Sequence, residues 1–177
     1  RDEFCTAIGF DPARPILLYV CSVLSRPAPP EAPFVLDWIR SLRESDDPRL
    51  AQANILIRPH PERLGEWQNV DVSGLGRVAV RGRNPIDPDA KREYFDSIFF
   101  SDAVVGIITS AFIEAAVVGR PSLTIETAAF TEHQEGAPHY HYLRDAAAGL
   151  LMVASDFADH QAQLRAILDG DPTAAAR

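Results

Sequence analysis

The chain has 177 residues, of which 46% are hydrophobic and 24% are charged, and its formal net charge is −8 at pH 7. This length suits one well-packed domain and is too short for two domains of ordinary size. The negative charge argues against general nucleic-acid binding, which depends on a basic surface, and no apolar run reaches the roughly 18 to 20 residues of a membrane-spanning helix.

Cys5 and Cys21 are the two cysteines of the chain, too few for a disulfide framework or a zinc site. We therefore expect a reducing, cytoplasmic location and no structural metal. The sequence also contains no Walker-type phosphate loop, no GxSxG nucleophile motif and no HExxH metal motif. Nothing in the pattern calls for a bound cofactor.

Short apolar runs alternate with helical stretches along the chain. In chain order, we expect a helix that ends near Gly9, a strand at 16–20, a helix at 34–45, strands at 55–57 and 78–80, a helix at 87–102, a strand at 103–108, a helix at 109–121, a strand at 122–125, a long loop at 126–139, a helix or turn at 140–143, a strand at 150–153, a helix at 157–168 and a frayed tail at 170–177.

Short, almost entirely apolar strands separated by helices are typical of a parallel sheet that is covered on both faces. The pattern therefore predicts a single α/β domain over residues 1–177. We expect a doubly wound, Rossmann-like and mostly parallel sheet of about six strands, with helices on both faces. In such sheets, ligands bind outside the carboxyl ends of the strands.

Arg58-Pro59-His60-Pro61-Glu62 follows the strand predicted at 55–57. Each proline fixes its own φ and favours an extended conformation in the residue before it, so Arg58 and His60 are held at the strand end. Both side chains suit contact with an anionic phosphate. The alternative is a stiff exit from the strand with solvent-exposed polar side chains.

Thr109 and Ser110 stand between the fourth strand and the helix that follows it. Two hydroxyls and free backbone N–H groups at this position form an anion-binding arrangement. Glu114 follows one turn later, where its carboxylate could accept hydrogen bonds from ribose hydroxyls. The alternative is helix capping by Ser110 with favourable dipole interaction of Glu114.

The segment "ETAAFTEHQEGAPHYHYL" contains Glu126, His133 and Glu135. Its spacing fits no standard zinc pattern, so we expect no metal. A polar loop at the strand ends that contacts a ligand suits the pattern better. The alternative is a structural loop that Tyr140 and Tyr142 anchor to the core.

The runs "PILLYVCS", "ILIRPHP" and "DAVVGIITSAFIEAAVVGRPSLTI" together resemble the nucleotide-binding half of GT-B type glycosyltransferases and their polymer-phosphotransferase relatives. Their order is similar to the strand–Ser loop, HP motif and Ser-capped helix of CDP-glycerol glycerophosphotransferases and some capsule or sialic-acid transferases. The resemblance covers most of residues 15–125.

The resemblance implies roles for individual residues. His60, Thr109 and Ser110 would contact the phosphates of the donor substrate, with His60 as the catalytic residue. Glu114 would hold the ribose, and Ser22 would lie over the diphosphate. A GT-B enzyme also has a second Rossmann-like domain, here expected on the N-terminal side, which carries the acceptor site and the base. The domain alone would then bind its donor substrate without turnover, and any peripheral membrane association would belong to the full-length protein.

Three functions follow from these patterns. The first is the donor-binding domain of a glycosyl- or polyol-phosphate transferase that uses a nucleotide-activated sugar in cell-surface polysaccharide synthesis. The second is a UDP-N-acetylglucosamine 2-epimerase-like domain, for which Glu126 and Glu135 are the candidate catalytic acids. The third is a non-catalytic α/β module that binds a partner through residues 126–143.

Overall fold

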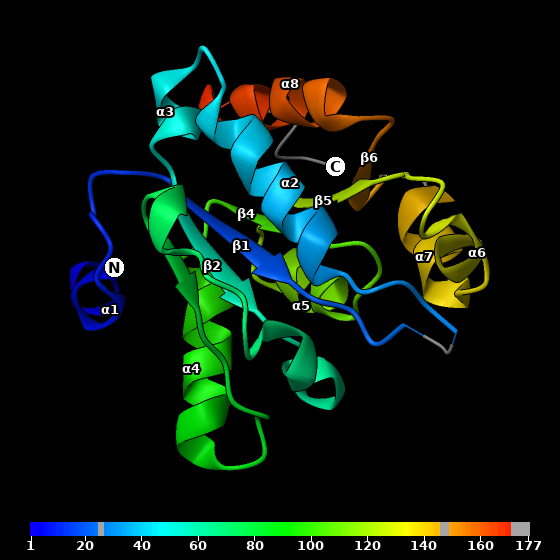
Figure 1. The fold of residues 1–177 in the computed structure, drawn as a ribbon, viewed down its shortest axis with the longest axis horizontal. Helices are drawn as coiled ribbons and strands as arrows, with labels where there is room; N and C mark the ends of the chain where they lie inside the picture. Colours follow the sequence, from blue (N-terminus) through cyan, green and yellow to red (C-terminus); the bar gives the residue numbers. More distant parts are fainter. Residues whose placement is uncertain (25–26, 146–148, 171–177) are drawn as a thin grey trace.

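A computed structural model describes residues 1–24, 27–145 and 149–170, and in it the chain forms a six-stranded sheet covered by helices (Figure 1). The strand order is β3-β2-β1-β4-β5-β6, and every neighbouring pair is parallel. The predicted doubly wound α/β fold is therefore confirmed. The strands are β1 Ile16–Val20, β2 Asn54–Arg58, β3 Val78–Val80, β4 Ala103–Val105, β5 Ser122–Ile125 and β6 Leu151–Ala154.

Helices cover both faces of this sheet. The α-helices are α1 Asp2–Ile8, α2 Ala32–Arg43, α3 Pro48–Ala51, α4 Pro88–Phe99, α5 Ala111–Val117, α6 Thr131–Glu135, α7 Pro138–Asp145 and α8 Phe157–Leu168, and the 3-10 helices are η1 Pro61–Trp67 and η2 Ser73–Leu75. Buried side chains of α2, α3 and α8 form one core cluster with the sheet, and those of α1, α4, α5 and α7 form a second on the opposite face.

Strand β1 lies at the centre of the sheet, and all five of its residues are buried. Its side chains alternate between the faces, as the period of a strand requires: Leu17 and Tyr19 join the α2 cluster, whereas Leu18 and Val20 join the α4 cluster. The chain leaves β1 toward β2 on one side and returns to β4 on the other. The carboxyl ends of β1 and β4 therefore form the topological switch point of the sheet, where ligands bind in open α/β folds.

Gly106 allows β4 to approach β1 closely at this point. A Cβ atom at Gly106 would lie 2.8 Å from the carbonyl oxygen of Val20, closer than such contacts allow. The residue after β4 must therefore be a glycine for the two strand ends to stay together. The strand predicted at 103–108 ends at Val105, and residues 106–108 form an irregular exit instead.

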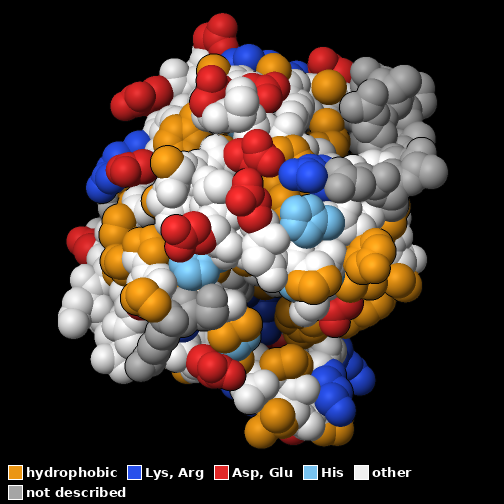
Figure 2. All heavy atoms as spheres, turned by 90° about the vertical axis from the view of Figure 1, so that its right-hand side faces the viewer, with side chains coloured by type: hydrophobic (Ala, Val, Ile, Leu, Met, Phe, Trp, Pro, Cys, Tyr) orange, Lys and Arg blue, Asp and Glu red, His pale blue; other side chains and the backbone are white. Residues whose placement is uncertain are grey.

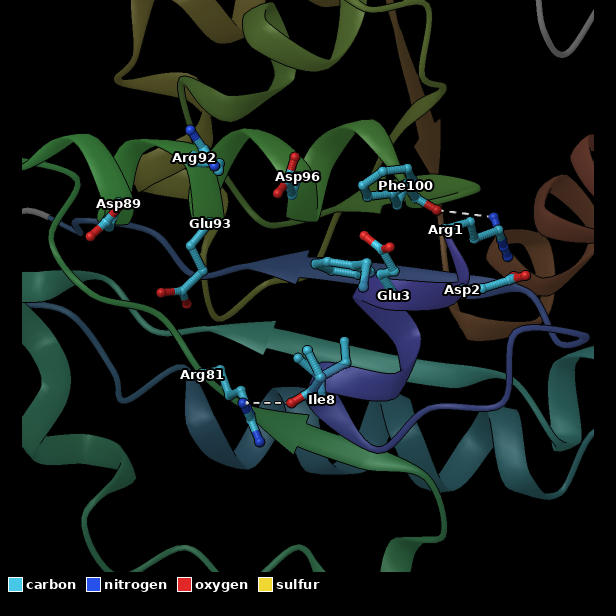
Figure 3. A pocket seen from close by; sticks show the side chains of 12 residues that line it. Arg1, Asp2, Glu3, Ile8, Arg81, Asp89, Arg92, Glu93, Asp96 and Phe100 are labelled. Atoms are coloured by element: carbon cyan, nitrogen blue, oxygen red, sulfur yellow. Dashed lines mark hydrogen bonds between the residues drawn. The ribbon is translucent and has the colours of Figure 1, made fainter.

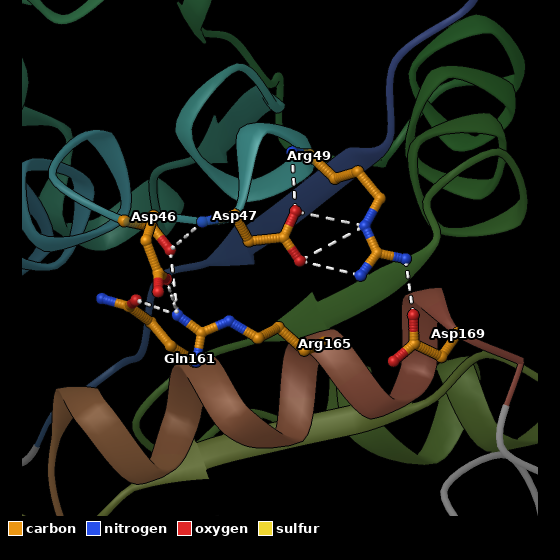
Figure 4. A network of polar contacts seen from close by, with 7 residues as sticks. Asp46, Asp47, Arg49, Gln161, Arg165 and Asp169 are labelled. Atoms are coloured by element: carbon orange, nitrogen blue, oxygen red, sulfur yellow. Dashed lines mark hydrogen bonds and ion pairs between the residues drawn. The ribbon is translucent and has the colours of Figure 1, made fainter.

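Helix α8 is joined to the segment before β2 by ion pairs that Figure 4 shows. Arg49 pairs with both Asp47 and Asp169 at 2.7 Å, and Arg165 pairs with Asp46 at 2.7 Å. Solvent-accessible pairs of this kind each contribute about 0–1 kcal/mol, so the network adds little to stability. Buried Leu164 and partly buried Phe157, Ile167 and Leu168 supply the apolar contacts of the same helix.

The long loop predicted at 126–139 is wrong, because this segment contains α6 and the start of α7. Phe130, Gln134 and Tyr140 are buried and bind the segment to the sheet. Tyr140 is thus an anchor, as one alternative predicted, whereas Tyr142 is 77% exposed. The predicted frayed tail lies outside the described residues except for Gly170. Across the described ranges, no helix has the length and apolar character needed to cross a membrane.

Candidate functional site

Two adjoining hollows mark the carboxyl edge of the sheet at the switch point. One, of about 980 Å³, lies between the residues after β1 and helix η1. The other, of about 290 Å³, lies between those residues, the β4–α5 turn and helices α6 and α7. Val23 and Leu24 line both. Figure 2 shows the face that α6 and α7 form, with a hollow whose rim carries hydrophobic and histidine side chains.

The β4–α5 turn forms one wall of the smaller hollow, and its central peptide group is held on both sides. The carbonyl oxygen of Ile107 accepts hydrogen bonds from the hydroxyl of Thr124, at 2.9 Å, and from the side-chain amide of Gln134, at 3.3 Å. The N–H of the same peptide group, that of Ile108, donates to the hydroxyl of Ser22 at 3.0 Å. Strand β5, helix α6 and the segment that follows β1 therefore fix this turn together.

Thr109 and Ser110 come directly after the fixed peptide group, and both line the smaller hollow. The hydroxyl of Thr109 accepts a hydrogen bond from the N–H of Ala111 at 3.3 Å, and Ser110 is exposed. Ser110 is the N-cap residue of α5 but makes no side-chain capping bond, so the predicted alternative of capping by Ser110 is wrong. Gly119, with φ of 69°, directly follows the C-cap residue of α5, a position where glycine is favoured.

Ser22 is buried, with 1% of its surface exposed, and its polar groups are already paired. Its backbone N–H donates to the carboxylate of Glu31 at 2.7 Å, and its hydroxyl lies 3.4 Å from the other oxygen of that carboxylate. The hydroxyl of Tyr19 donates to the same carboxylate at 3.0 Å. Ser22 thus belongs to the wall behind the hollow, not to its open surface.

Glu31 is the buried acid at the centre of this wall, with 1% of its surface exposed. Burial raises its pKa to about 7, although the hydrogen bonds from Ser22 and Tyr19 oppose that shift. Glu66 lies nearby and accepts a hydrogen bond from the backbone N–H of Glu31 at 3.0 Å. Arg63 in turn pairs with Glu66 and donates to the carbonyl of Pro29 at 3.0 Å.

His60 lies beyond the end of β2, half-buried at the start of η1. Its Nδ1 accepts a hydrogen bond from the N–H of Glu62 at 3.2 Å, which caps the helix. Burial lowers the pKa of His60, so the ring is neutral at pH 7. Since Nδ1 accepts a hydrogen bond, the single proton of the neutral ring is on Nε2, where it can be donated.

Arg58 and Glu114 meet at a third residue, Tyr94 of α4. The guanidinium of Arg58, with 5% of the residue exposed, lies 5.2 Å from the centre of the Tyr94 ring and 3.3 Å from the carboxylate of Glu93. The hydroxyl of Tyr94 donates to Glu114. Glu114 lines a separate apolar hollow between α4 and α5. The structure therefore places these two charged groups against α4, apart from Thr109 and Ser110.

Of the ligand contacts predicted within residues 126–143, some line the smaller hollow and others do not. His133 lines the smaller hollow beside Thr109, and so does His139, whose Nε2 is buried without a hydrogen-bond partner among the described residues. Glu126 accepts a hydrogen bond from Tyr140 at 3.0 Å and lines another hollow, beside α8. The carbonyl of Glu135 contacts a ring nitrogen of His141 at 2.7 Å.

A further hollow of about 910 Å³ lies between α1 and α4 (Figure 3). It is lined by three arginines and five acidic residues: Arg1, Arg81, Arg92, Asp2, Glu3, Asp89, Glu93 and Asp96. This excess of acidic side chains does not favour a phosphate-bearing ligand. Among the residues that the structure describes, no three His, Cys, Asp or Glu side chains are arranged to hold a metal ion.

Two residues of the site were not predicted from the sequence. Glu31 lies in the proline-rich stretch "RPAPPEAP", where a single acidic residue is expected to be an ordinary solvent-exposed loop residue. Gln134 fell within the predicted loop, and only its burial and its bonds to Ile107, Thr124 and Ile125 reveal its role. No short sequence pattern marks either of them.

The comparisons with known proteins concern the fold. No family model and no curated protein matches the chain. A variant of the wall teichoic acid polymerase TagF matches with a TM-score of 0.62 at 12% identity, over 98% of this chain and 40% of that one. A TagF structure soaked with CDPG matches with a TM-score of 0.60 at 14% identity, over 99% and 39%.

A structure that describes EarP-mediated arginine glycosylation of elongation factor EF-P gives a TM-score of 0.49 at 17% identity, over 98% of this chain and 57% of that one. The chain spans about 40% of the length of the TagF chains that it matches. At these identities the likeness concerns architecture alone. Over nearly all of its length, this chain shares the fold of the matching part of TagF.

Proposed function

We propose that this chain is the donor-binding part of a glycosyl- or polyol-phosphate transferase that acts on a nucleotide-activated donor substrate. The observation that carries the proposal is the hollow at the switch point, which Thr109, Ser110 and His133 line. His60 lies just beyond the end of β2, the strand next to β1 in the sheet. The likeness in fold to TagF, one structure of which was soaked with CDPG, supports the same assignment.

In the proposed mechanism, the chain positions the donor substrate and stabilises charge. The hydroxyls of Thr109 and Ser110 bind phosphate oxygens at the rim of the hollow. Because His60 is neutral and carries its proton on Nε2, it donates a hydrogen bond to the leaving phosphate as negative charge develops there. Fixed hydrogen-bond donors of this kind lower the barrier because they need no rearrangement during the reaction.

Ser22 acts in this proposal from behind the hollow, since its hydroxyl is buried. The donor contacts predicted for Arg58 and Glu114 stay predictions. In the structure, Arg58 pairs with Glu93 and Glu114 accepts a hydrogen bond from Tyr94, both on α4. The contacts predicted for Glu126 and Glu135 also stay predictions, since neither lines the smaller hollow.

The remaining expectations concern the full-length protein. We propose that a second Rossmann-like domain, N-terminal to this one, supplies the acceptor site and the base. A role in cell-surface polysaccharide synthesis, a cytoplasmic location and peripheral association with the membrane belong to the same proposal. The matched part of TagF, about 40% of its length, leaves room in such a protein for that second domain.

A thermal-shift screen tests the proposal, with CMP, CDP, UDP, GDP and their sugar or glycerol conjugates as probes. A ligand present at 100 times its Kd stabilises the folded state by about 2.7 kcal/mol, which raises the Tm measurably. We expect nucleotides of one base to raise the Tm of the wild-type chain. His60→Asn should remove most of this rise, because asparagine can still cap η1 but lacks the Nε2–H group.

The matched control is His141→Asn, which changes a histidine of α7 whose ring contacts the carbonyl of Glu135, away from the end of β2. This variant should keep the full nucleotide-dependent rise in Tm. If no probe raises the Tm of the wild-type chain, the proposed function is wrong for this domain. If His60→Asn keeps the rise, nucleotide binding stands but the role of His60 does not.

A further inference from the structure

Glu31 is an unusual residue for the wall of a hollow, because it is an acid with 1% of its surface exposed. Burying a carboxylate is unfavourable unless hydrogen-bond donors surround it. Here the backbone N–H of Ser22 donates to one carboxylate oxygen at 2.7 Å, and the hydroxyl of Tyr19 donates to the other at 3.0 Å. An uncharged residue of the same size would fill the space without this cost, so packing alone does not explain the acid.

The contact between the hydroxyl of Ser22 and the carboxylate points to a specific role for Glu31. A serine hydroxyl has one proton to donate and lone pairs with which to accept. The proton of Ser22 points to Glu31, 3.4 Å away, which leaves the lone pairs toward the N–H of Ile108 at 3.0 Å. The carboxylate therefore keeps the serine hydroxyl in the orientation that accepts the Ile108 N–H.

The peptide group between Ile107 and Ile108 sets the direction of the two residues that follow it. Its carbonyl is fixed by Thr124 and Gln134, and Ser22 is the one partner of its N–H among the residues that the structure describes. If Ser22 turned away, that peptide group would lose its partner on the β1 side. Thr109 and Ser110, which line the hollow, would then lose part of their support.

We propose that Glu31 is a positioning residue of the donor site, which acts through Ser22 on the Ile107–Ile108 peptide group and thereby on Thr109 and Ser110. The proposal rests on the function proposed above. Glu31 does not contact the donor substrate in it. Among the described residues, the other titratable or charged groups that act on the carboxylate are Glu66, Arg63, Tyr19 and Cys21, and the N–H of Ile108 donates to Ser22 instead.

The first readout is independent of any nucleotide. Amide hydrogen exchange at Ile108, followed by NMR, reports whether its N–H keeps its partner. We expect Glu31→Gln and Ser22→Ala each to speed exchange at Ile108 by about tenfold or more relative to the wild-type chain. Glu44→Gln changes an exposed acid at the opposite end of α2 and should leave this rate unchanged.

The second readout is the Kd for CDP, measured by calorimetry at a temperature where every variant is folded. Glu31→Gln should weaken CDP binding about tenfold and Glu44→Gln should not. If Glu31 acts through Ser22, the double variant with Ser22→Ala should bind CDP more tightly than the product of the two single losses predicts. A role in stability alone would lower the Tm of Glu31→Gln and leave the Kd unchanged.

The outcomes separate the two proposals. If the wild-type chain binds neither CDP nor any other nucleotide of the screen, the proposed function fails, and exchange at Ile108 alone decides whether Glu31 holds the turn. If the wild-type chain binds CDP and Glu31→Gln matches it in both Kd and Ile108 exchange, the positioning role is overturned. Independent, multiplicative losses in the double variant would also overturn the route through Ser22.

Discussion

The hydroxyl of Ser22 accepts a 3.0 Å hydrogen bond from the backbone N–H of Ile108, and this bond joins the ends of β1 and β4 at the switch point of the sheet. The carbonyl of the same peptide group is bound by Thr124 and Gln134. A turn outside regular structure is thus given partners for both of its polar backbone groups. That arrangement makes the rim residues Thr109 and Ser110 a preorganised surface.

Thr124→Val tests the carbonyl side of this arrangement. Valine has nearly the same shape, so the variant removes the hydroxyl bond to Ile107 with little change in packing. We expect the free energy of unfolding to fall by about 1–2 kcal/mol, since a buried carbonyl loses a partner. Urea unfolding measures it. Thr6→Val, at an exposed position of α1, should change stability by less than about 0.5 kcal/mol, and equal effects at both positions would contradict the prediction.

Gly106→Ala tests the close approach of β4 to β1. The added Cβ atom would lie 2.8 Å from the carbonyl oxygen of Val20, so the strand end must move. Overpacking of this kind costs about 1–3 kcal/mol, and we expect a loss of that size together with weaker nucleotide binding. Gly74→Ala is the control, because nothing lies within 4 Å of its added Cβ. A Gly106→Ala chain as stable as Gly74→Ala would show that the strand ends tolerate separation.

Apolar runs in the sequence predicted the strands well, because a parallel sheet buried on both faces needs continuous apolar segments. All six predicted strands are present in the structure. The 126–139 segment was missed for the opposite reason. Its helices α6 and α7 are short and polar, and buried Phe130, Gln134 and Tyr140 attach them to the sheet. Such tertiary contacts leave no periodic signal in so short a segment.

Only part of the candidate site could be predicted from the sequence. Thr109, Ser110 and His60 each follow the carboxyl end of a parallel strand, and chain position alone therefore places them at the same edge of the sheet. The direction of a side chain depends on neighbours from distant segments. Arg58 pairs with Glu93 of α4, and the hydrogen-bond donors to Glu31 are Tyr19 of β1 and Ser22.

Arg58→Ala tests whether Arg58 has a structural role. The side chain is buried against Tyr94 and pairs with Glu93, so its removal takes away packing as well as charge. We expect a loss of about 2 kcal/mol in the free energy of unfolding, measured with urea. Arg40→Ala removes an exposed arginine that pairs within α2 and should cost less than about 0.5 kcal/mol. A stable Arg58→Ala chain that no longer binds nucleotide would instead assign Arg58 to the ligand.

Glu31 and His160 should give the stability of the chain opposite dependences on pH. Burial raises the pKa of Glu31 from 4.5 to about 7, so between these values the folded chain holds a proton that the unfolded chain releases, and stability falls as the pH rises. Burial lowers the pKa of His160 from 6.5 to about 3, so the unfolded chain binds the extra proton there, and stability rises with pH.

The two windows overlap between pH 4.5 and 6.5, where the slopes have opposite signs and a size of about 1.4 kcal/mol per pH unit each. We therefore expect these two groups nearly to cancel in the wild-type chain, as followed by urea unfolding at several pH values. Glu31→Gln should lose stability by about that slope on acidification from pH 6.5, because His160 then acts unopposed. His160→Leu should gain stability over the same range. Parallel profiles for the two variants would contradict the assignment, since it requires their slopes to differ in sign.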